Sequence, residues 1–322
     1  MNRYETLLLD TASRDERLVV ITAENRGHMR TVPPMLGDRF IDVGIAEQTM
    51  IGMAAGMAVR GRVVVTHALA AFLTMRAFEF IRDDVAIANA SVIMVGMVPG
   101  VLSDGNGPTH QAIEDVSIMR GLPNMGVFCP CDESEFIDGM RVLLESRRPW
   151  YVRYISTPDL AIDRVAFEPG VAAVVRGEAL HRPNVTILTY GFLTRQCIEA
   201  AEELGRDDVQ VRVVNMRTLK PADEKAILHA AATSELVVTV EDHLLTGGLA
   251  SIVAETLMVH GKGAHVLTIG FPTWFTPGRL DEVLTNERIS SSAIAQRIRQ
   301  RLADIVHAAV KPPSSTHEVS HD

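Results

Sequence analysis

The chain is poor in cysteine and in basic residues, and it has no long hydrophobic run. Its three cysteines among 322 residues form an odd, sparse set, which argues against a disulfide framework and indicates a reducing cytoplasm. Lysine and arginine number 31 against 40 acidic residues, and this net charge of −9 argues against a nucleic-acid partner, because phosphate binding needs a basic face. The most apolar stretch, 91–102, is interrupted by Gly96, Pro99 and Gly100, so no membrane span is expected.

The residues that are present predict an α/β protein. Hydrophobic residues make up 47% of the chain, and its length suits two domains of about 150 residues each. Short β-branched runs alternate with helical patterns, which is typical of mostly parallel sheets flanked by helices on both faces. Strands are expected at 18–22, 39–43, 62–66, 91–97, 125–128, 150–154, 185–190, 209–214, 236–240 and 265–269. Helices are expected at 46–60, 70–89, 132–146, 192–204, 221–233, 248–260 and 292–305.

The alternation pauses once, and this pause defines the expected domains. Residues 158–184 contain three prolines and no long periodic stretch, so they are interpreted as a linker on the surface. The first domain then covers 1–157 and the second covers 185–308. The last residues, 309–322, are rich in proline, serine and histidine and are expected to be a disordered tail.

Residues 39–59 run from a strand directly into a helix that is apolar on every side and studded with glycine and alanine. Such a helix is expected at a subunit interface or in a large core, because small residues allow another backbone to approach closely. Glu47 lies in its first turn. On composition alone, Glu47 could simply be an acidic partner of the helix dipole.

Several further motifs occur in the chain in the order in which one protein family has them. Residues 44–48 with the following helix resemble the pyrimidine-binding domain of the transketolase family. The further matches, in chain order, are 70–74, 77–82, 107–115, 119–125, 219–223 and 240–248. This resemblance covers the chain up to about residue 302 and implies a pyrimidine-binding domain followed by the transketolase C-terminal domain.

The resemblance implies that thiamine diphosphate is the cofactor. In this family a buried carboxyl group hydrogen-bonds N1′ of the aminopyrimidine, so that the cofactor's own amino group removes the thiazolium C2 proton. The resemblance gives that role to Glu47, which makes it both catalytic and cofactor-binding. It also implies that Phe72 stacks on the pyrimidine and that Leu69 stands where relatives have the first aromatic residue of the pocket. A plain core position remains the alternative for Phe72.

The resemblance also implies a substrate side to the site. His110, in the loop after Gly107, is expected to be catalytic and to face the substrate carbon skeleton as a donor of hydrogen bonds or protons. Arg153 matches an arginine that binds a substrate phosphate in many relatives. The alternative for His110 is a loop histidine whose hydrogen bonds go to backbone groups. The alternative for Arg153 is a surface ion pair. His28 and Asn106 align with further substrate-binding positions.

The pattern departs from the family at several of these positions. Val98 stands where relatives have a histidine, Asn106 where they have an acidic residue, and His28 where they have a small polar phosphate contact. His67, just before the pocket, is also unusual. Losing a phosphate donor and a hydroxyl-binding carboxylate leads to the hypothesis of an altered substrate rather than an ordinary sugar phosphate.

The Gly-Asp-Gly motif with its downstream asparagine, through which relatives hold Mg²⁺ and the diphosphate, has no match in this chain. No metal ligand is therefore assigned here. A partner subunit is expected to supply the Mg²⁺ ligands, which predicts an α2β2 assembly.

Together these observations favour a subunit of a thiamine diphosphate-dependent transketolase-like enzyme that transfers a two-carbon ketol unit from a ketose to an aldehyde. One alternative is a carboligase subunit similar to deoxyxylulose phosphate synthase, which uses pyruvate. Another is a non-catalytic assembly or regulatory partner that keeps the fold. Residues 241–243, Glu-Asp-His, are interpreted as a loop before a helix rather than as a second site.

Overall fold

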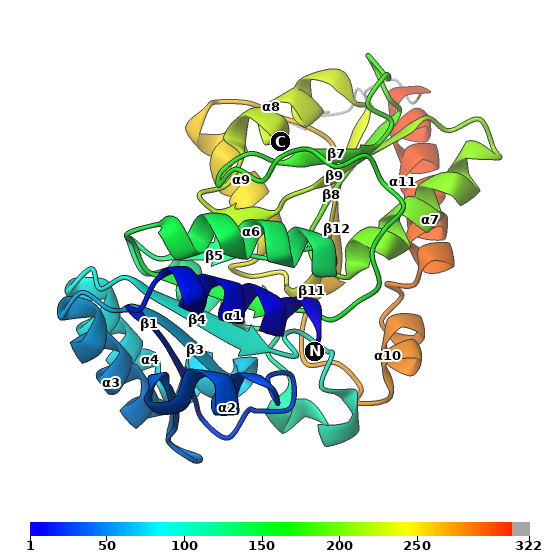
Figure 1. Cartoon of the computed structure of the whole chain (residues 1–322). Coiled ribbons are helices and arrows are strands. Elements are labelled where there is room, and N and C mark those ends of the chain that lie inside the picture. Colours follow the sequence, from blue (N-terminus) through cyan, green and yellow to red (C-terminus); the bar gives the residue numbers. More distant parts are fainter. Residues whose placement is uncertain (311–322) are drawn as a thin grey trace, which may run out of the picture.

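The computed structural model describes residues 1–310, which form two α/β domains around two separate sheets (Figure 1). The expected disordered tail, 309–322, begins inside the final helix α11 (Ser291–Val310), and its remainder lies outside the described residues. Both domains confirm the predicted class of mostly parallel sheets flanked by helices.

The first sheet has seven strands in the order β10-β5-β6-β4-β3-β1-β2. All neighbours are parallel except β10 and β5. Its strands are β1 (Leu18–Thr22), β2 (Phe40–Asp42), β3 (Val63–Leu69), β4 (Val92–Met97), β5 (Gly126–Phe128), β6 (Trp150–Tyr154) and β10 (Thr218–Lys220).

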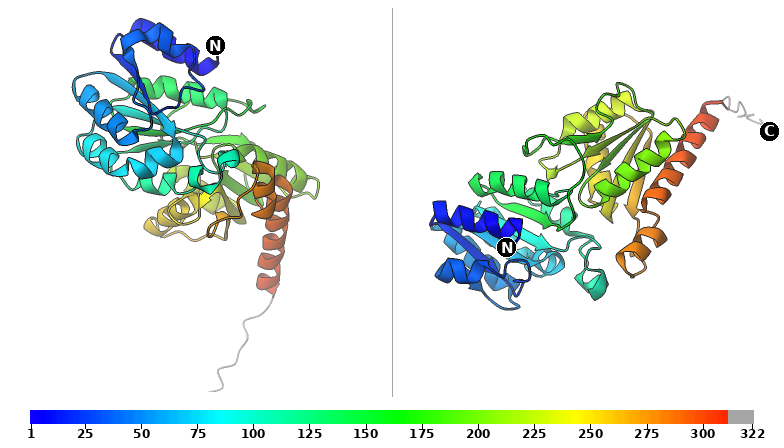
Figure 2. Two further views of the ribbon diagram at one scale, coloured as in Figure 1. Left: turned by 90° about the horizontal axis from the view of Figure 1, so that it is seen from below. Right: turned by 45° about the vertical axis from the view of Figure 1, so that its right-hand side comes forward.

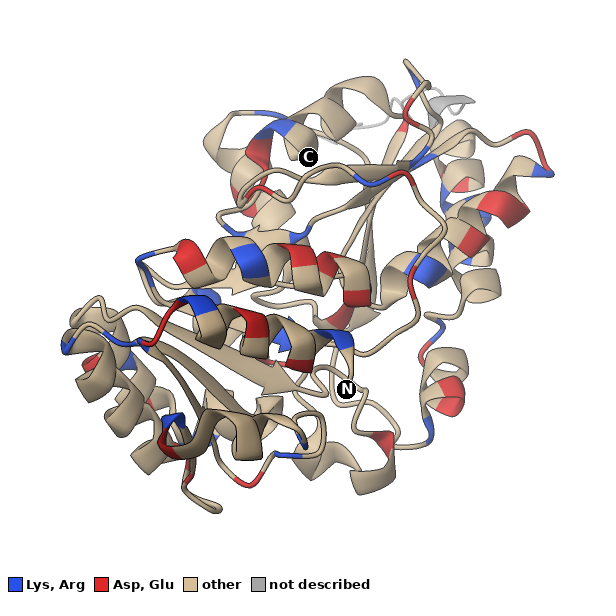
Figure 3. Cartoon of the chain, in the orientation of Figure 1, with Lys and Arg blue, Asp and Glu red and all other residues tan. Residues whose placement is uncertain are grey.

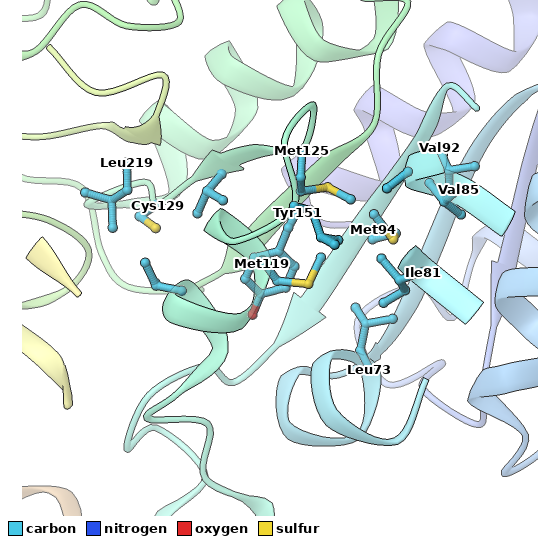
Figure 4. Close-up of a cluster of buried hydrophobic side chains, with 14 of the residues drawn as sticks. Leu73, Ile81, Val85, Val92, Met94, Met119, Met125, Cys129, Tyr151 and Leu219 are labelled. Carbon is cyan, nitrogen blue, oxygen red and sulfur yellow. The ribbon is translucent and has the colours of Figure 1, made fainter. Parts of the chain in front are cut away.

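Helices cover both faces of this sheet because its strand residues alternate between two cores. Leu18 and Val20 of β1 pack in one cluster with α1 (Arg3–Arg14), α2 (Val32–Leu36) and α6 (Glu133–Glu145). Val19 and Ile21 pack in the other, with α3 (Glu47–Val59) and α5 (Asp115–Arg120). Figure 4 shows part of this second core, in which Leu73, Met94, Met119 and Tyr151 meet. Short 3₁₀ turns complete the domain: η1 (Gly37–Arg39), η4 (Asp104–Asn106) and η5 (Pro108–His110).

The single helix expected at 70–89 is instead broken into π-helical and α-helical turns. These are η2 (Phe72–Arg76), α4 (Phe78–Phe80) and η3 (Ile81–Ile87). A π turn widens the helix and changes the direction of the side chains that follow, and such turns are frequent at functional sites. η2 begins at Phe72 and ends at Arg76, so the π-helical distortion includes a residue predicted to bind the cofactor.

The second sheet has five strands in the order β12-β11-β8-β9-β7. They are β7 (Ala173–Arg176), β8 (Val185–Thr189), β9 (Val211–Asn215), β11 (Leu236–Leu244) and β12 (Val266–Phe271). α7 (Leu193–Gly205) and α11 cover one face, whereas α8 (Glu224–Thr233) and α9 (Leu249–Val259) cover the other. A short helix, α10 (Leu280–Asn286), follows β12.

The range 158–184, predicted to be a linker, is not one throughout. Its residues 173–176 form β7, which pairs antiparallel with β9 and closes the edge of the second sheet. A four-residue strand in a proline-containing stretch gives little local signal, because its pairing partner lies about forty residues later. Likewise, β11 extends to Leu244, so Glu241, Asp242 and His243 belong to a buried strand and not to a loop.

The two domains share one core. The cluster around α3 and α5 continues into Leu188, Val214 and the inner sides of α8 and α9. β10 comes from the second half of the chain but pairs with β5 of the first sheet. No helix among residues 1–310 is long and apolar enough to cross a membrane.

Candidate active site

Glu47, Phe72 and His110 all follow strands at the same edge of the first sheet. Glu47 begins α3 shortly after β2, Phe72 comes three residues after the end of β3, and His110 lies in the segment after β4. The carboxyl ends of parallel strands face one edge of the sheet, which is where open α/β sheets bind ligands.

Glu47 is buried, with 2% of its surface exposed, at the amino end of α3. Its Oε2 accepts a hydrogen bond of 2.8 Å from Nη1 of Arg76. The guanidinium carbon of Arg76 lies 4.3 Å from the centre of the Phe72 ring. Arg76 therefore joins the carboxylate to the aromatic ring. Oε1 of Glu47 has no hydrogen-bond partner among residues 1–310, so this carboxylate oxygen is free to hydrogen-bond a group from outside the chain.

His110 completes this group. Its ring meets Phe72 edge-on, with the two ring centres 4.9 Å apart, and its Nδ1 lies 3.0 Å from the hydroxyl of Thr109. Behind Phe72 is a buried cluster of three alanines, Ala70, Ala71 and Ala112. Small side chains there leave the half-buried Phe72 ring facing the site.

The structure does not bring the other predicted residues into this group. Leu69 ends β3 but packs in the core on the α1 side of the sheet. The half-buried ring of His28 packs 5.3 Å from that of Tyr154. Asn106 is exposed, and its amide donates to Ser103 Oγ at 3.1 Å.

Arg153 is buried, and all three nitrogens of its guanidinium donate hydrogen bonds to carboxylates. Its Nε donates to Asp115 Oδ2 at 2.9 Å, while Nη1 and Nη2 donate to Asp242 at 2.7 and 3.2 Å. Burial opposes its charge, but these two carboxylates raise the pKa of Arg153 well above its usual value. The guanidinium of Arg153 is therefore enclosed by two carboxylates that neutralise its charge, which leaves it poorly placed for a substrate phosphate. The alternative of a surface ion pair is wrong, since this pair is fully buried and joins the two domains.

The sequence reading missed Arg76 and the partner of His67. Arg76 has no motif of its own, and only its position four residues after Phe72 on a helical pattern would have suggested a shared face. His67 is fully buried on β3, and its Nε2 lies 2.6 Å from the hydroxyl of Tyr4 in α1. Burial lowers the pKa of His67 to about 3, so this histidine is neutral and fastens α1 to the sheet.

The residues present suit the pyrimidine end of thiamine diphosphate but offer nothing for a metal. A free oxygen on buried Glu47 beside the Phe72 ring matches a flat heterocycle whose ring nitrogen shares a proton with a carboxyl group. Among residues 1–310, no group of three or more His, Cys, Asp or Glu side chains is arranged to hold a metal ion.

Comparison with protein families agrees with this geometry. Residues 2–156 match the pyrimidine-binding domain of transketolase, and residues 172–310 match the transketolase C-terminal domain.

Individual relatives include proteins whose names describe them as transketolase subunits or sections. The chain is 37% identical to the 6-deoxy-6-sulfo-D-fructose transketolase subunit SqwH of a Clostridium species, over 79% of each chain. It is 34% identical to a putative transketolase C-terminal section of Methanocaldococcus jannaschii, covering 93% of this chain and 95% of the relative. The 1-deoxy-D-xylulose-5-phosphate synthase of Acidobacterium capsulatum is 33% identical over 90% of this chain, which spans 47% of that enzyme.

Solved structures show the same arrangement of domains. A split-gene transketolase in an inactive β4 tetramer superimposes with a TM-score of 0.83 and 30% identity, covering 93% of this chain and 97% of that one. The Campylobacter jejuni transketolase shares the fold over 46% of its length, with a TM-score of 0.76 and 19% identity. The family matches, the relatives and the superposition agree that this chain belongs to the transketolase family and corresponds to its pyrimidine-binding and C-terminal domains.

Proposed function

We propose that this chain is the pyrimidine-binding subunit of a split, thiamine diphosphate-dependent transketolase that transfers a two-carbon ketol unit from a ketose to an aldehyde. The observation that supports this most is the position of Glu47, which is buried with one free carboxylate oxygen next to Phe72 and His110.

In this proposal each residue of the group has one task. Glu47 shares a proton with N1′ of the aminopyrimidine in a hydrogen bond that fixes the orientation of the ring, and Phe72 provides an aromatic face for it. Leu69 is proposed for the pocket wall on the family resemblance alone, because in the structure it packs in the core on the α1 side of the sheet. When bound, thiamine diphosphate supplies the nucleophilic carbon that attacks the ketose carbonyl. His110 donates hydrogen bonds or a proton to substrate oxygens, since its Nε2 is not needed by Thr109.

A partner subunit completes the site by carrying the Mg²⁺ and diphosphate ligands, in an α2β2 complex in the cytoplasm. The surface beside the site supports this. Apolar side chains on adjacent elements are exposed: Ile45 (73%), Val59 (68%), Met75 (44%), Phe80 (39%) and Ile87 (70%). Figure 3 shows α3 almost without charge, and Glu47 is its one charged residue. Large exposed apolar areas mark interaction sites in soluble proteins.

We propose a ketose substrate that is not an ordinary sugar phosphate, with His28, Asn106 and Arg153 as the remaining substrate candidates. Among these Arg153 has the weakest claim, because its guanidinium is buried and already bound to Asp115 and Asp242. The sulfosugar in the name of the Clostridium relative is one example of a changed anionic end. Turnover of 6-deoxy-6-sulfo-fructose and of xylulose 5-phosphate, each with an aldehyde acceptor, compares the two classes. Ordinary transketolase rates with xylulose 5-phosphate and ribose 5-phosphate would contradict an altered substrate.

A second candidate is a pyruvate-using carboligase, favoured by the 33% identity to deoxyxylulose phosphate synthases over most of this chain. Release of CO2 from pyruvate by the reconstituted complex would select it. Ketol transfer without CO2 release would select transketolase.

The decisive experiment compares Glu47→Ala with Glu79→Ala, an exposed glutamate of the nearby α4. In the complex with the partner subunit, Glu47→Ala should abolish turnover while sedimentation shows unchanged assembly. Glu79→Ala should keep wild-type activity. An active Glu47→Ala complex would instead favour a non-catalytic role for this chain. Calorimetry on the chain alone should show weak cofactor binding, and tight metal-dependent binding would contradict the need for a partner.

A further inference from the structure

The loop that carries His110 is a closed unit. Gly100 and Ala112 exchange two backbone hydrogen bonds, each of 2.9 Å, so residues 101–111 form a loop with its ends joined. Immediately inside and outside this closure, Val101 and Ile113 are fully buried in the core of the second domain, together with Ile187, Phe271 and Val283. The loop therefore belongs to the first domain by sequence, but the residues at its base pack in the core of the second domain.

The second domain also holds the base of this loop. Leu244, at the end of β11, donates its backbone N–H to Ile113 at 2.9 Å. Asp242 accepts hydrogen bonds from Nη1 and Nη2 of Arg153, and its carboxylate lies directly against Gly100. A buried charge pair with two hydrogen bonds has one well-defined geometry, so the base of the loop is fixed by a rigid contact.

The tip of the loop has its own contact with the second domain. Oδ2 of Asp104 accepts a hydrogen bond of 3.0 Å from the backbone N–H of Leu280, the first residue of α10. In Figure 2 the orange α10 lies beside the segment that carries the loop. The two residues are 176 positions apart, and they are bound across the domain boundary.

The backbone of the loop shows why such contacts matter. Val98 has φ of 44° and Gly100 has φ of 59°, which places both in the left-handed region. That region is unfavourable for a β-branched residue, and such conformations persist only when the surroundings impose them. The contact of Asp242 with Gly100 is part of such surroundings at the base of the loop, and the contact of Asp104 holds the loop near its tip.

We propose that the C-terminal domain positions the catalytic loop, with Asp104 as a positioning residue that keeps His110 against Phe72. The role of His110 in turnover rests on the function proposed above, whereas the position of the loop does not. The Asp104 side chain bonds to Leu280 and not to Phe72 or His110, so it acts through the loop backbone.

The test is hydrogen exchange of the full-length chain, followed by mass spectrometry of peptides that cover 101–112. Removing a charge-assisted hydrogen bond costs enough to raise the local opening equilibrium by about tenfold. Asp104→Ala should therefore speed exchange in this peptide about tenfold. Asp104→Asn keeps an oxygen acceptor and should restore most of the protection. Asp281→Ala, which removes an exposed acidic residue of α10 (75% side-chain exposure), is the matched control and should have no effect.

A second measurement is the NMR chemical shift of the His110 imidazole protons. The ring current of Phe72 shifts the imidazole protons of His110, and this shift should diminish in Asp104→Ala and return in Asp104→Asn. Unchanged exchange and unchanged imidazole shifts in Asp104→Ala would overturn the proposal, as would an equal effect of Asp281→Ala. If the wild-type complex with its partner proved inactive, the proposed function would fail, but the exchange and NMR results would still decide the positioning role.

Discussion

Arg76 donates a hydrogen bond to Glu47 at 2.8 Å while its guanidinium lies over the ring of Phe72. A planar, hydrogen-bonding group is thus held between the carboxylate and the aromatic ring that are proposed to receive the aminopyrimidine. Since Glu47 is buried and Arg76 is 40% exposed, the arginine neutralises the carboxylate from the solvent side and fixes its rotamer.

Replacing Arg76 should weaken the use of the cofactor. Without its partner, Glu47 loses a fixed orientation, so Arg76→Ala should raise the thiamine diphosphate concentration for half-maximal activity by about tenfold. Arg76→Lys keeps the charge but lacks the planar guanidinium, so its half-maximal cofactor concentration should lie between those of the wild type and Arg76→Ala. The measurement is a cofactor titration of the reconstituted complex. Arg206→Ala, at an exposed arginine at the end of α7, is the control, and equal curves for the two alanine variants would contradict this role.

Much of this fold is readable from the sequence because its main signals are local. The buried runs at 18–22 and 150–154 coincide with β1 and β6, and α3 differs from its prediction by one residue at each end. β10 was missed because a three-residue strand is defined by its pairing with β5, which lies about ninety residues away. α1 was missed as well, although Asn2 and Glu5 form a capping box at its start.

The candidate site divides in the same way. Glu47, Phe72 and His110 were assigned from the family resemblance, and all three follow predicted strands, whose carboxyl ends share one edge of a parallel sheet. Arg153 also lies on a predicted strand, but its partners Asp115 and Asp242 come from distant segments. Only the packing of the two domains shows that its charge is used for structure.

His67 should make the protein sensitive to acid. Its pKa is lowered by burial to about 3, below the value of about 6.5 in an unfolded chain, so the unfolded state binds a proton more readily. The contribution is fully present above pH 6.5 and is lost as pH falls towards 3, by at most about 1.4 kcal/mol per pH unit.

Urea unfolding at pH 7.5 and pH 5.5 measures this loss. His67→Gln keeps a partner for the Tyr4 hydroxyl but cannot gain a proton, so its stability should fall less over this range than that of the wild type. His181→Gln, at an exposed histidine, should behave like the wild type. An equal pH dependence in all three proteins would show that His67 is not buried in its neutral form.

Removing Asp242 should destabilise the chain strongly. Arg153 would keep its buried charge while losing the bidentate partner, and breaking a buried pair in this way typically costs about 3–5 kcal/mol. Chemical unfolding of Asp242→Ala tests this. Asp138→Ala breaks the exposed pair with Arg141 and should cost no more than about 0.5 kcal/mol. Similar losses for the two variants would mean that the buried pair adds nothing specific to the domain contact.

Two glycines of the loop segment should respond differently to replacement by alanine. At Gly100, φ is 59° and an added Cβ would clash with Asp242 and lie 2.9 Å from Nη2 of Arg153. Gly100→Ala should therefore lower the free energy of unfolding by more than about 1 kcal/mol, because backbone strain adds to the clash. Gly105 has open space around it and no left-handed φ, so Gly105→Ala should be neutral or stabilise by about 0.4–1 kcal/mol through the unfolded state. Thermal unfolding compares them, and a stable Gly100→Ala variant would mean that Asp242 does not press on the base of the loop.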